Sequence, residues 1–182
     1  MTRERADAAR NRARILAAAA DLVAARGVEG LGMAEVAAAS GVGVGTLYRR
    51  FGDQSGLLHA LIDQSERAFQ ESFLSGPPPL GPGAPAAERV RAFLHALVDR
   101  TLAQLDLLLV AETAGPFARF GGAYDAYHRH LGVLIGQAWP AADAAFLADA
   151  LLAPLAANLI THRHHDATRL KAGLDALLPP PG

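Results

Sequence analysis

The chain has 182 residues, the size of one domain or two small ones, which excludes a large multidomain enzyme. It is 51% hydrophobic and 19% charged, so it has enough apolar side chains for a core and wholesale disorder is excluded. The net charge of −1 provides no overall basic field, and the lack of cysteine excludes disulfides, thiolate metal sites and a cysteine nucleophile. The charged N-terminal sequence has no apolar segment typical of a signal peptide, and polar residues interrupt the apolar stretch 141–160; we therefore expect a cytoplasmic protein.

The composition predicts an all-α fold. Alanine and leucine, both strong helix formers, are abundant, and no segment alternates apolar and polar residues over the length of a strand. In chain order, the apolar spacing and the glycine and proline breaks predict helices over about 8–25, 33–40 and 44–51, then a helix capped by Asp53, then 86–113, 117–138, 141–164 and 167–178. Pro154 predicts a kink in the third of these last four stretches, because it cannot donate a backbone hydrogen bond.

The charge is distributed unevenly along the chain. Residues 1–60 hold eight arginines against six acidic residues, whereas residues 61–182 hold nine basic residues against twelve acidic ones. The segment 75–86, with five prolines and three glycines, is the one clear linker, because these residues favour neither helix nor sheet.

Two of the predicted helices, 33–40 and 44–51, are short and joined by a glycine-containing turn, which is typical of a helix-turn-helix. Gly41 allows the turn a positive φ, and Gly45 allows a phosphate to approach the backbone of the second helix. The buried face of that helix is predicted to consist of Val44, Leu47 and Phe51. Its exposed side is predicted to offer a hydroxyl, a phenol and two guanidinium groups to phosphates and base edges, from Thr46, Tyr48, Arg49 and Arg50.

Over Leu31 to Ile62 the sequence resembles the TetR (tetracycline-repressor) family of bacterial transcriptional regulators. The family pattern is an Ile/Val-Ala pair, Ala-Gly-Val, a small residue, any residue, Gly-Thr-Leu-Tyr, two variable positions and Phe. It appears here as Val36-Ala37, Ser40-Gly41-Val42, Gly43-Val44, Gly45-Thr46-Leu47-Tyr48 and Phe51. The resemblance implies a helix-turn-helix DNA-binding domain at 1–53 and a helical effector-binding and dimerisation domain at 54–182, which includes the Pro/Gly-rich loop 75–86.

The resemblance also implies roles for single residues. Val44 and Arg49 would contact base edges in the major groove of palindromic double-stranded DNA. Phosphates would be held by Gly45, Thr46, Tyr48 and Arg50, and the start of the preceding helix, at Met33 and Ala34, would face the DNA backbone.

Three positions depart from the family pattern. Gly32 and Gly43 stand where Ser or Thr is common, and Gln54-Ser55 replace a usual Lys, which removes one phosphate contact. A basic N-terminal segment either compensates by reaching an adjacent groove or is a solvated tail; its arginines are Arg3, Arg5, Arg10, Arg12 and Arg14.

The second domain is expected to form a homodimer, because two recognition helices double the contacts across a palindrome. Two leucine stripes are suited to a four-helix interface, although they could also pack within one chain: Leu147, Leu151, Leu155 and Leu159, then Leu170, Leu174 and Leu177.

Aromatic and polar residues mixed along the same domain predict a pocket for an apolar or amphipathic effector. Glu112, Thr113 and Asn158 stand among apolar neighbours and would need partners if buried. The predicted pocket residues are Phe93, Glu112, Tyr124, Tyr127, His128 and Asn158, with Phe117 and Phe120 nearby in the sequence.

The sequence therefore predicts a DNA-binding transcriptional regulator, most simply a repressor released by an effector, and no enzyme. One alternative is a small α-helical enzyme using a pair such as His165-Asp166, but the chain has no nucleophile elbow, phosphate loop or paired metal motif. Another is a helix-turn-helix protein without an effector. We expect no cofactor and no metal: His162 and His165 have helical ligand spacing, but they stand at a predicted helix C-terminus, where the helix dipole favours His.

Overall fold

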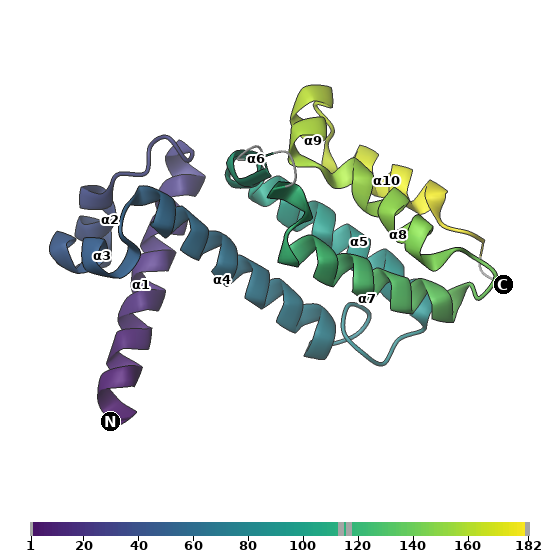
Figure 1. The fold of residues 1–182 in the computed structure, drawn as a ribbon, viewed down its shortest axis with the longest axis horizontal. Coiled ribbons are helices and arrows are strands. Elements are labelled where there is room, and N and C mark those ends of the chain that lie inside the picture. The colour runs from purple at the N-terminus through teal and green to yellow at the C-terminus, as the bar shows by residue number, and fades with distance from the viewer. Residues whose placement is uncertain (1, 113–114, 116–117, 181–182) are drawn as a thin grey trace. The chain divides into compact units, whose positions relative to one another are not determined.

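The computed structural model describes residues 2–112, 115 and 118–180, and all secondary structure within these ranges is helical, as predicted. The chain divides into two compact units, Met1–Arg67 and Ala68–Gly182. This division lies inside helix α4, Gln54–Ser75, further along the chain than the predicted boundary at 53/54. Figure 1 shows the course of the helices within each unit.

The first unit contains α1 (Thr2–Arg26), α2 (Met33–Ser40), α3 (Val44–Phe51) and the start of α4. Helix α2 packs against both α1 and α3. The unit has a small apolar core, because each helix contributes side chains at helical spacing: Ile15, Leu16 and Ala19 from α1, Met33 and Val36 from α2, Leu47 and Phe51 from α3, and Leu57 and Leu61 from α4.

The turn between α2 and α3 has the predicted geometry. Gly41 lies in the left-handed region with φ 64°, and the Val42 N–H donates to the Ala37 carbonyl at 3.1 Å, which closes the C-terminus of α2. The Asp53 side chain accepts from the Gly56 N–H at 2.8 Å, so it caps α4 as predicted.

The second unit contains α5 (Ala86–Ala103), α6 (Leu105–Glu112), α7 (Gly122–Ala138), α8 (Ala144–Leu152), α9 (Ala157–Arg163) and α10 (Ala167–Leu177), with short 3₁₀ helices η1 (Ala118–Phe120) and η2 (Ala153–Leu155). Helix α7 packs against α5 and α8, and α10 packs against the other side of α5 (Figure 1). The core between them is rich in aromatic and leucine side chains.

Three of the predicted stretches are interrupted. In 117–138, η1 comes first and α7 begins only at Gly122. Helix 86–113 breaks at Gln104, and helix 141–164 begins only at Ala144 and breaks at Pro154 instead of kinking. Around Pro154 the backbone forms η2, and α9 restarts with a bend of 50° from the helix before it. The missing N–H and the ring of proline explain the break.

No single helix in the described ranges is long and apolar enough to cross a membrane; the bent pair Ala144–Leu155 and Ala157–Arg163 meets that test together, on length and composition alone.

Candidate nucleic-acid interface

Among the described residues, no side chain caps or covers the N-terminus of α3. Its cap, Gly43, makes no side-chain hydrogen bond, and the Thr46 N–H donates back to the Gly43 carbonyl at 2.9 Å. A Cβ placed on Gly43 or Gly45 would meet nothing within 4 Å. Because the first N–H groups of a helix have no intrahelical acceptor, this end of α3 can donate to an anion that approaches closely.

The side chains of α3 divide into a buried and an exposed set. Leu47 and Phe51 anchor the helix in the core, whereas Val44 is 45% exposed and Tyr48 is 51% exposed. Val44 therefore does not belong to the buried face, contrary to the prediction, because it stands in the first turn, beyond the reach of the core. Arg49 is exposed and Thr46 is half-buried, so most of the predicted contact residues face solvent together.

The start of α2 presents fewer groups to a nucleic acid than the sequence predicted. The Met33 side chain is buried, with 8% exposed, so only its backbone could face a nucleic acid. Ala34 is exposed, but Glu35 follows it in the first turn and pairs with Arg26 at 2.9 Å. A carboxylate at this position opposes the approach of a phosphate.

Three arginines connect the helices of this unit. Arg50 on α3 donates to the Ala8 carbonyl on α1 at 2.7 Å, and the Arg12 guanidinium lies 5.6 Å from the centre of the Phe51 ring. Arg14 donates to the Ser40 carbonyl at the end of α2. Arg50 was predicted only as a phosphate ligand; its contact with Ala8 joins residues 42 positions apart, which no local pattern signals.

Helix α1 also differs from the prediction. The basic N-terminal segment continues α1 back to Thr2 instead of forming a separate arm or tail. Arg10 pairs with Asp7 on the same helix. The side chains of Arg3 and Arg5 lie outside those that the structure describes.

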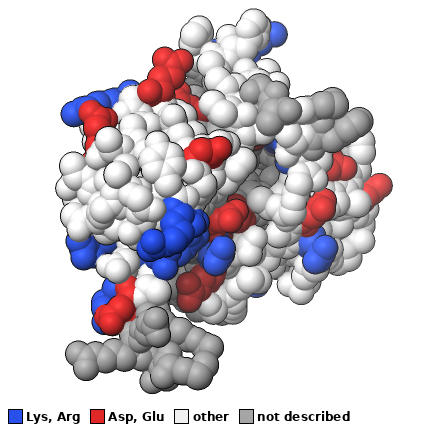
Figure 2. Space-filling view, turned by 60° about the vertical axis from the view of Figure 1, so that its left-hand side comes forward, with Lys and Arg blue, Asp and Glu red and all other residues white. Residues whose placement is uncertain are grey.

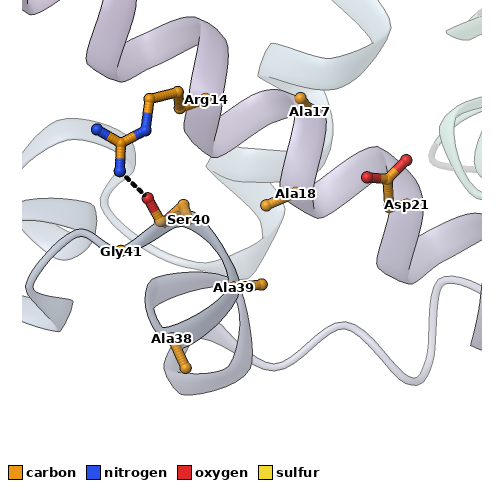
Figure 3. Close-up of a pocket in the computed structure, with 8 residues that line it drawn as sticks. All are labelled: Arg14, Ala17, Ala18, Asp21, Ala38, Ala39, Ser40 and Gly41. Carbon is orange, nitrogen blue, oxygen red and sulfur yellow. Dashed lines mark hydrogen bonds between the residues drawn. The ribbon is translucent and has the colours of Figure 1, made fainter.

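A cleft of about 430 Å³ lies where α1 crosses the end of α2 (Figure 3). Half of its lining residues are alanines, and Arg14 reaches across it to the Ser40 carbonyl. Asp21 stands at the other end (Figure 3). Because the one cation that lines the cleft is already bonded and an acid lines its other end, this cleft is unsuited to an anion. It reflects the small side chains that let α1 and α2 approach each other.

In Figure 2, Lys and Arg side chains gather in one prominent blue cluster, while Asp and Glu side chains are scattered around it. The surface thus has a local basic region despite the net charge of −1. A nearly neutral protein can bind a polyanion through such a region.

The predicted effector residues occupy three places in the second unit, and the second and third adjoin each other, because the Arg119 guanidinium lies 5.7 Å from the centre of the Tyr124 ring. Phe93 and Tyr127 lie in a tight aromatic cluster with Phe69 and Phe73, with ring centroids 5.0–6.3 Å apart. This cluster also holds His130, which was not among the predicted pocket residues, although its spacing of three from Tyr127 places both on one face of α7. Burial and, secondarily, Arg89 lower the pKa of His130 to about 4.

The second place is a charged clasp formed by Glu112 and Arg119, whose side chains are each 17% exposed. Glu112 accepts from the Ala157 N–H at 2.9 Å, and Arg119 donates to the Leu152 carbonyl at 2.7 Å. The pair therefore caps both helix ends exposed by the break at Pro154.

The third place is the outer edge between α7 and α8. The Tyr124 hydroxyl donates to Asp149 at 2.9 Å, and the His128 Nε2 lies 3.3 Å from the same carboxylate. Burial, followed by the bond to Asp149, raises the pKa of Tyr124. Phe120 contacts Tyr124 edge to face. Asn158 is exposed and joins none of the three places, and Thr113 and Phe117 lie outside the described residues.

The leucine stripes contribute mainly to the core of their own chain. Leu151, Leu155, Leu170 and Leu174 are each at most 4% exposed, and Leu147 packs against the same core. Only Leu159, at 37%, and Leu177, at 50%, are exposed. Phe146, which belongs to neither predicted stripe, is 72% exposed on α8. Among the described residues, no three His, Asp or Glu side chains converge as a metal site would require.

Comparison with known proteins agrees with this architecture. Residues 15–61 match the family described as bacterial regulatory proteins, tetR family. A TetR-family transcriptional regulator from Pectobacterium atrosepticum is 25% identical, with a TM-score of 0.69 and full coverage of both chains. No curated protein matches the chain significantly.

Two other similar structures were solved with ligands. AibR, in complex with isovaleryl coenzyme A and operator DNA, is 23% identical, with a TM-score of 0.63 over 94% of this chain and 100% of that one. A putative transcriptional regulator from Saccharomonospora viridis, in complex with choline, is 21% identical, with a TM-score of 0.71 over 92% of this chain and 95% of that one. These likenesses show a shared fold.

Proposed function

The chain belongs, by its N-terminal domain, to the tetR family of bacterial regulatory proteins, and we propose that it is a sequence-specific transcriptional repressor. It binds a palindromic operator as a homodimer and is released by a small apolar or amphipathic effector. The proposed DNA binding rests on the geometry of α3. Its N-terminus has no side-chain cap, and Val44, Tyr48 and Arg49 are exposed. Leu47 and Phe51 anchor the helix in the core.

The contacts follow from this geometry. Val44 and Arg49 read base edges, the first through its methyl groups and the second through its guanidinium. Gly45 admits a phosphate to the helix backbone, and the hydroxyls of Thr46 and Tyr48 donate to neighbouring phosphates. In a homodimer, two copies of α3 reach successive major grooves about 34–36 Å apart, and a bound dimer represses by occupying a promoter.

The helical second unit is proposed to bind the effector. It combines a buried aromatic cluster with polar groups at its edge, Tyr124, His128 and Asp149, and with the clasp that holds the break between α8 and α9. Two proteins of this fold were solved with isovaleryl coenzyme A and with choline, which supports a ligand-binding role. Those ligands have opposite charges, so the fold does not define the effector's charge. Binding lowers operator affinity if the effector favours a spacing of the two α3 helices that DNA does not.

The first test is selection of bound duplexes from a random DNA pool, which requires no knowledge of the operator. We expect an enriched palindrome. Tyr48→Phe, which removes only the hydroxyl, should weaken binding to it by about 1 kcal/mol, the value of one hydrogen bond, without lowering the thermal stability. No enriched sequence at moderate salt would contradict the proposed function.

The substitution Gly45→Ala should lower operator affinity without lowering the stability of the fold. The added methyl group meets nothing in the protein, and alanine is up to about 1 kcal/mol better than glycine inside a helix, so the melting temperature should stay the same or rise. Operator affinity should fall, because the methyl group stands where a phosphate approaches. Gly173→Ala in α10, also with open space around it, is the matched control: it should have the same effect on stability and none on operator affinity.

The effector is sought by thermal-shift screening of small molecules, followed by operator release with each stabilising compound. A compound that stabilises the protein and releases the operator supports the proposal. A repressor without an effector would give no compound that does both.

A further inference from the structure

Two polar atoms beside the aromatic rings of the second unit are buried without a hydrogen bond. They are the Nε2 atom of His130 on α7 and the Nε atom of Arg89 on α5, and neither has a partner among the described residues. Folded proteins pair the large majority of their buried polar side-chain atoms. Two such nitrogens therefore indicate a place where a hydrogen-bonding group from outside the chain would fit.

The contacts of the two side chains place them at the same end of the aromatic cluster. The centre of the His130 ring lies 4.4 Å from that of Phe73 and 5.1 Å from that of Phe93. Arg89 stands one helical turn before Phe93 on α5, and its Nη2 donates to the Phe73 carbonyl at 3.3 Å. Phe73 and Phe93 thus form an apolar wall beside the two polar side chains.

This end of the cluster has a positive charge and no carboxylate to balance it. In the described part of the chain, the side-chain hydrogen bond of Arg89 goes to a carbonyl, not to an acid. The low pKa of His130 has the same origin, since burial and the charge of Arg89 cause it and no acidic residue opposes them. A cation would be repelled here. An ionised carboxylate has only acceptor oxygens and forms its stronger hydrogen bonds with charged donors.

The segment next to this end of the cluster is the Pro/Gly-rich loop 75–86. Phe73 lies just before the loop and Arg89 just after it, so their hydrogen bond joins the two ends of the loop. Leu80, in the loop, is partly buried and packs against the core that contains the aromatic cluster. Residues 76–85 form no helix, so a ligand that displaces Leu80 breaks no helical hydrogen bonds.

We propose that Arg89 and His130 bind the carboxylate of the effector, and that its apolar body takes the place of Leu80 against Phe73 and Phe93. The effector is then a small carboxylic acid, because the space it takes is that of one leucine side chain. The inference rests on the proposed effector binding, to which it adds the chemical class of the effector and the two residues that recognise it.

The probes are phenylacetate and hexanoate, each compared with its neutral amide. Binding to the full chain is measured by isothermal titration calorimetry at pH 7, where both acids are ionised. At least one acid should bind about tenfold to a hundredfold more tightly than its amide, the ratio expected for a hydrogen bond to a charged group. Acetate and inorganic phosphate lack the apolar body and should bind weakly or not at all.

Two substitutions test the nitrogen atoms. Arg89→Met keeps an unbranched side chain without the charge, and His130→Phe keeps an aromatic ring without nitrogen. Each should remove most of the advantage of the acid over its amide and leave amide binding nearly unchanged. Arg91→Met is the matched control, because it removes a more exposed arginine from the same helix and should preserve the advantage.

Leu80→Ala tests the place of the apolar body by a gain of affinity. It removes the side chain that the acid displaces, so the acid should bind more tightly than it does to the wild-type chain. Thermal melting of each variant identifies any that fail to fold. Weaker acid binding by a folded Leu80→Ala variant would refute this placement.

The outcomes separate this inference from the proposed function. If neither acid binds more tightly than its amide, or if the advantage persists in Arg89→Met and His130→Phe, the carboxylate site is refuted. The regulator and its effector then still stand if the random DNA pool gives an operator and another compound releases it. If acetate or phosphate binds as tightly as the acids, the site holds simple anions and the inference is refuted. If no duplex is selected, the proposed function fails, whereas calorimetry still decides whether the acid binds.

Discussion

At the residue scale, neighbouring side chains of the same type have different surroundings. Arg49 faces solvent with no partner on another helix among the described contacts, whereas Arg50 reaches back to the backbone of α1. Both were predicted on the exposed side of their helix, and both are exposed. Helical spacing gives the direction of a side chain from its own axis, but it does not say which other segment lies within reach.

His130 gives a prediction at the same scale. Its ring lies between Phe73 and Phe93, with centroids 4.4 and 5.1 Å away, and its Nε2 is buried without a hydrogen-bond partner. Burial first, and then Arg89, lower its pKa from 6.5 to about 4. Between these two pH values the unfolded chain binds the proton and the folded chain does not. Stability should therefore fall as the pH drops from 6.5 towards 4.

The measurement is the urea midpoint of unfolding at pH values from 7 to 4. His130→Leu should flatten the decrease in this window, because leucine has no proton to gain. His162→Gln removes an exposed histidine and should leave the decrease as in the wild type. An unchanged pH profile in His130→Leu would show that other groups cause the acid sensitivity.

At the element scale, the short helices of the first unit were predicted to the residue and the long helices of the second were not. Both α2 and α3 have the predicted bounds, because glycines that require a turn stand at their ends. The stretch 141–164 reads as one apolar helix, yet it divides at Pro154. The reason it can divide is the clasp of Glu112 and Arg119, which satisfies the backbone groups that the break leaves open.

Breaking the clasp should therefore destabilise the second unit. Arg119→Met leaves the Glu112 carboxylate partly buried without its cation and the Leu152 carbonyl without this donor. We expect a loss on the order of 2–3 kcal/mol, below the range for fully buried pairs because both side chains retain some solvent contact. Denaturant unfolding measures it.

Two variants control this experiment. Adding Glu112→Gln to Arg119→Met removes the uncompensated charge and should recover part of the loss. Arg91→Met breaks a more exposed ion pair with Asp175 and should cost less than about 1 kcal/mol. Equal losses for Arg119→Met and Arg91→Met would mean that the clasp is no more than a surface pair.

At the scale of the whole molecule, the homodimer stays a prediction, and the exposed side chains indicate which residues its interface would contain. Five of the seven leucines proposed for the interface pack inside the chain, so a partner would meet the other two, Leu159 and Leu177, together with Phe146. Phe146→Glu should raise the dimer dissociation constant, because it places a charge on an apolar contact. Affinity for a full palindrome should then approach that for a half-site.

Analytical ultracentrifugation and operator binding check this prediction together. Leu74→Glu, at a residue that is 60% exposed on α4, is the control and should leave the dimer intact. If Phe146→Glu dimerises as tightly as the wild type, the interface lies elsewhere on the second unit.

Local patterns in the sequence were enough to predict the helical class, the helix-turn-helix and most of the residues exposed along α3, because glycine turns, caps and helical periodicity act over a few neighbouring positions. Only the tertiary structure decided which leucines stay inside the chain, how the predicted effector residues divide among a core cluster, a clasp and a surface edge, and that Arg50 is bonded to α1. These outcomes depend on contacts between residues far apart in the chain, and an apolar stripe or an arginine has the same local pattern whichever partner it finds.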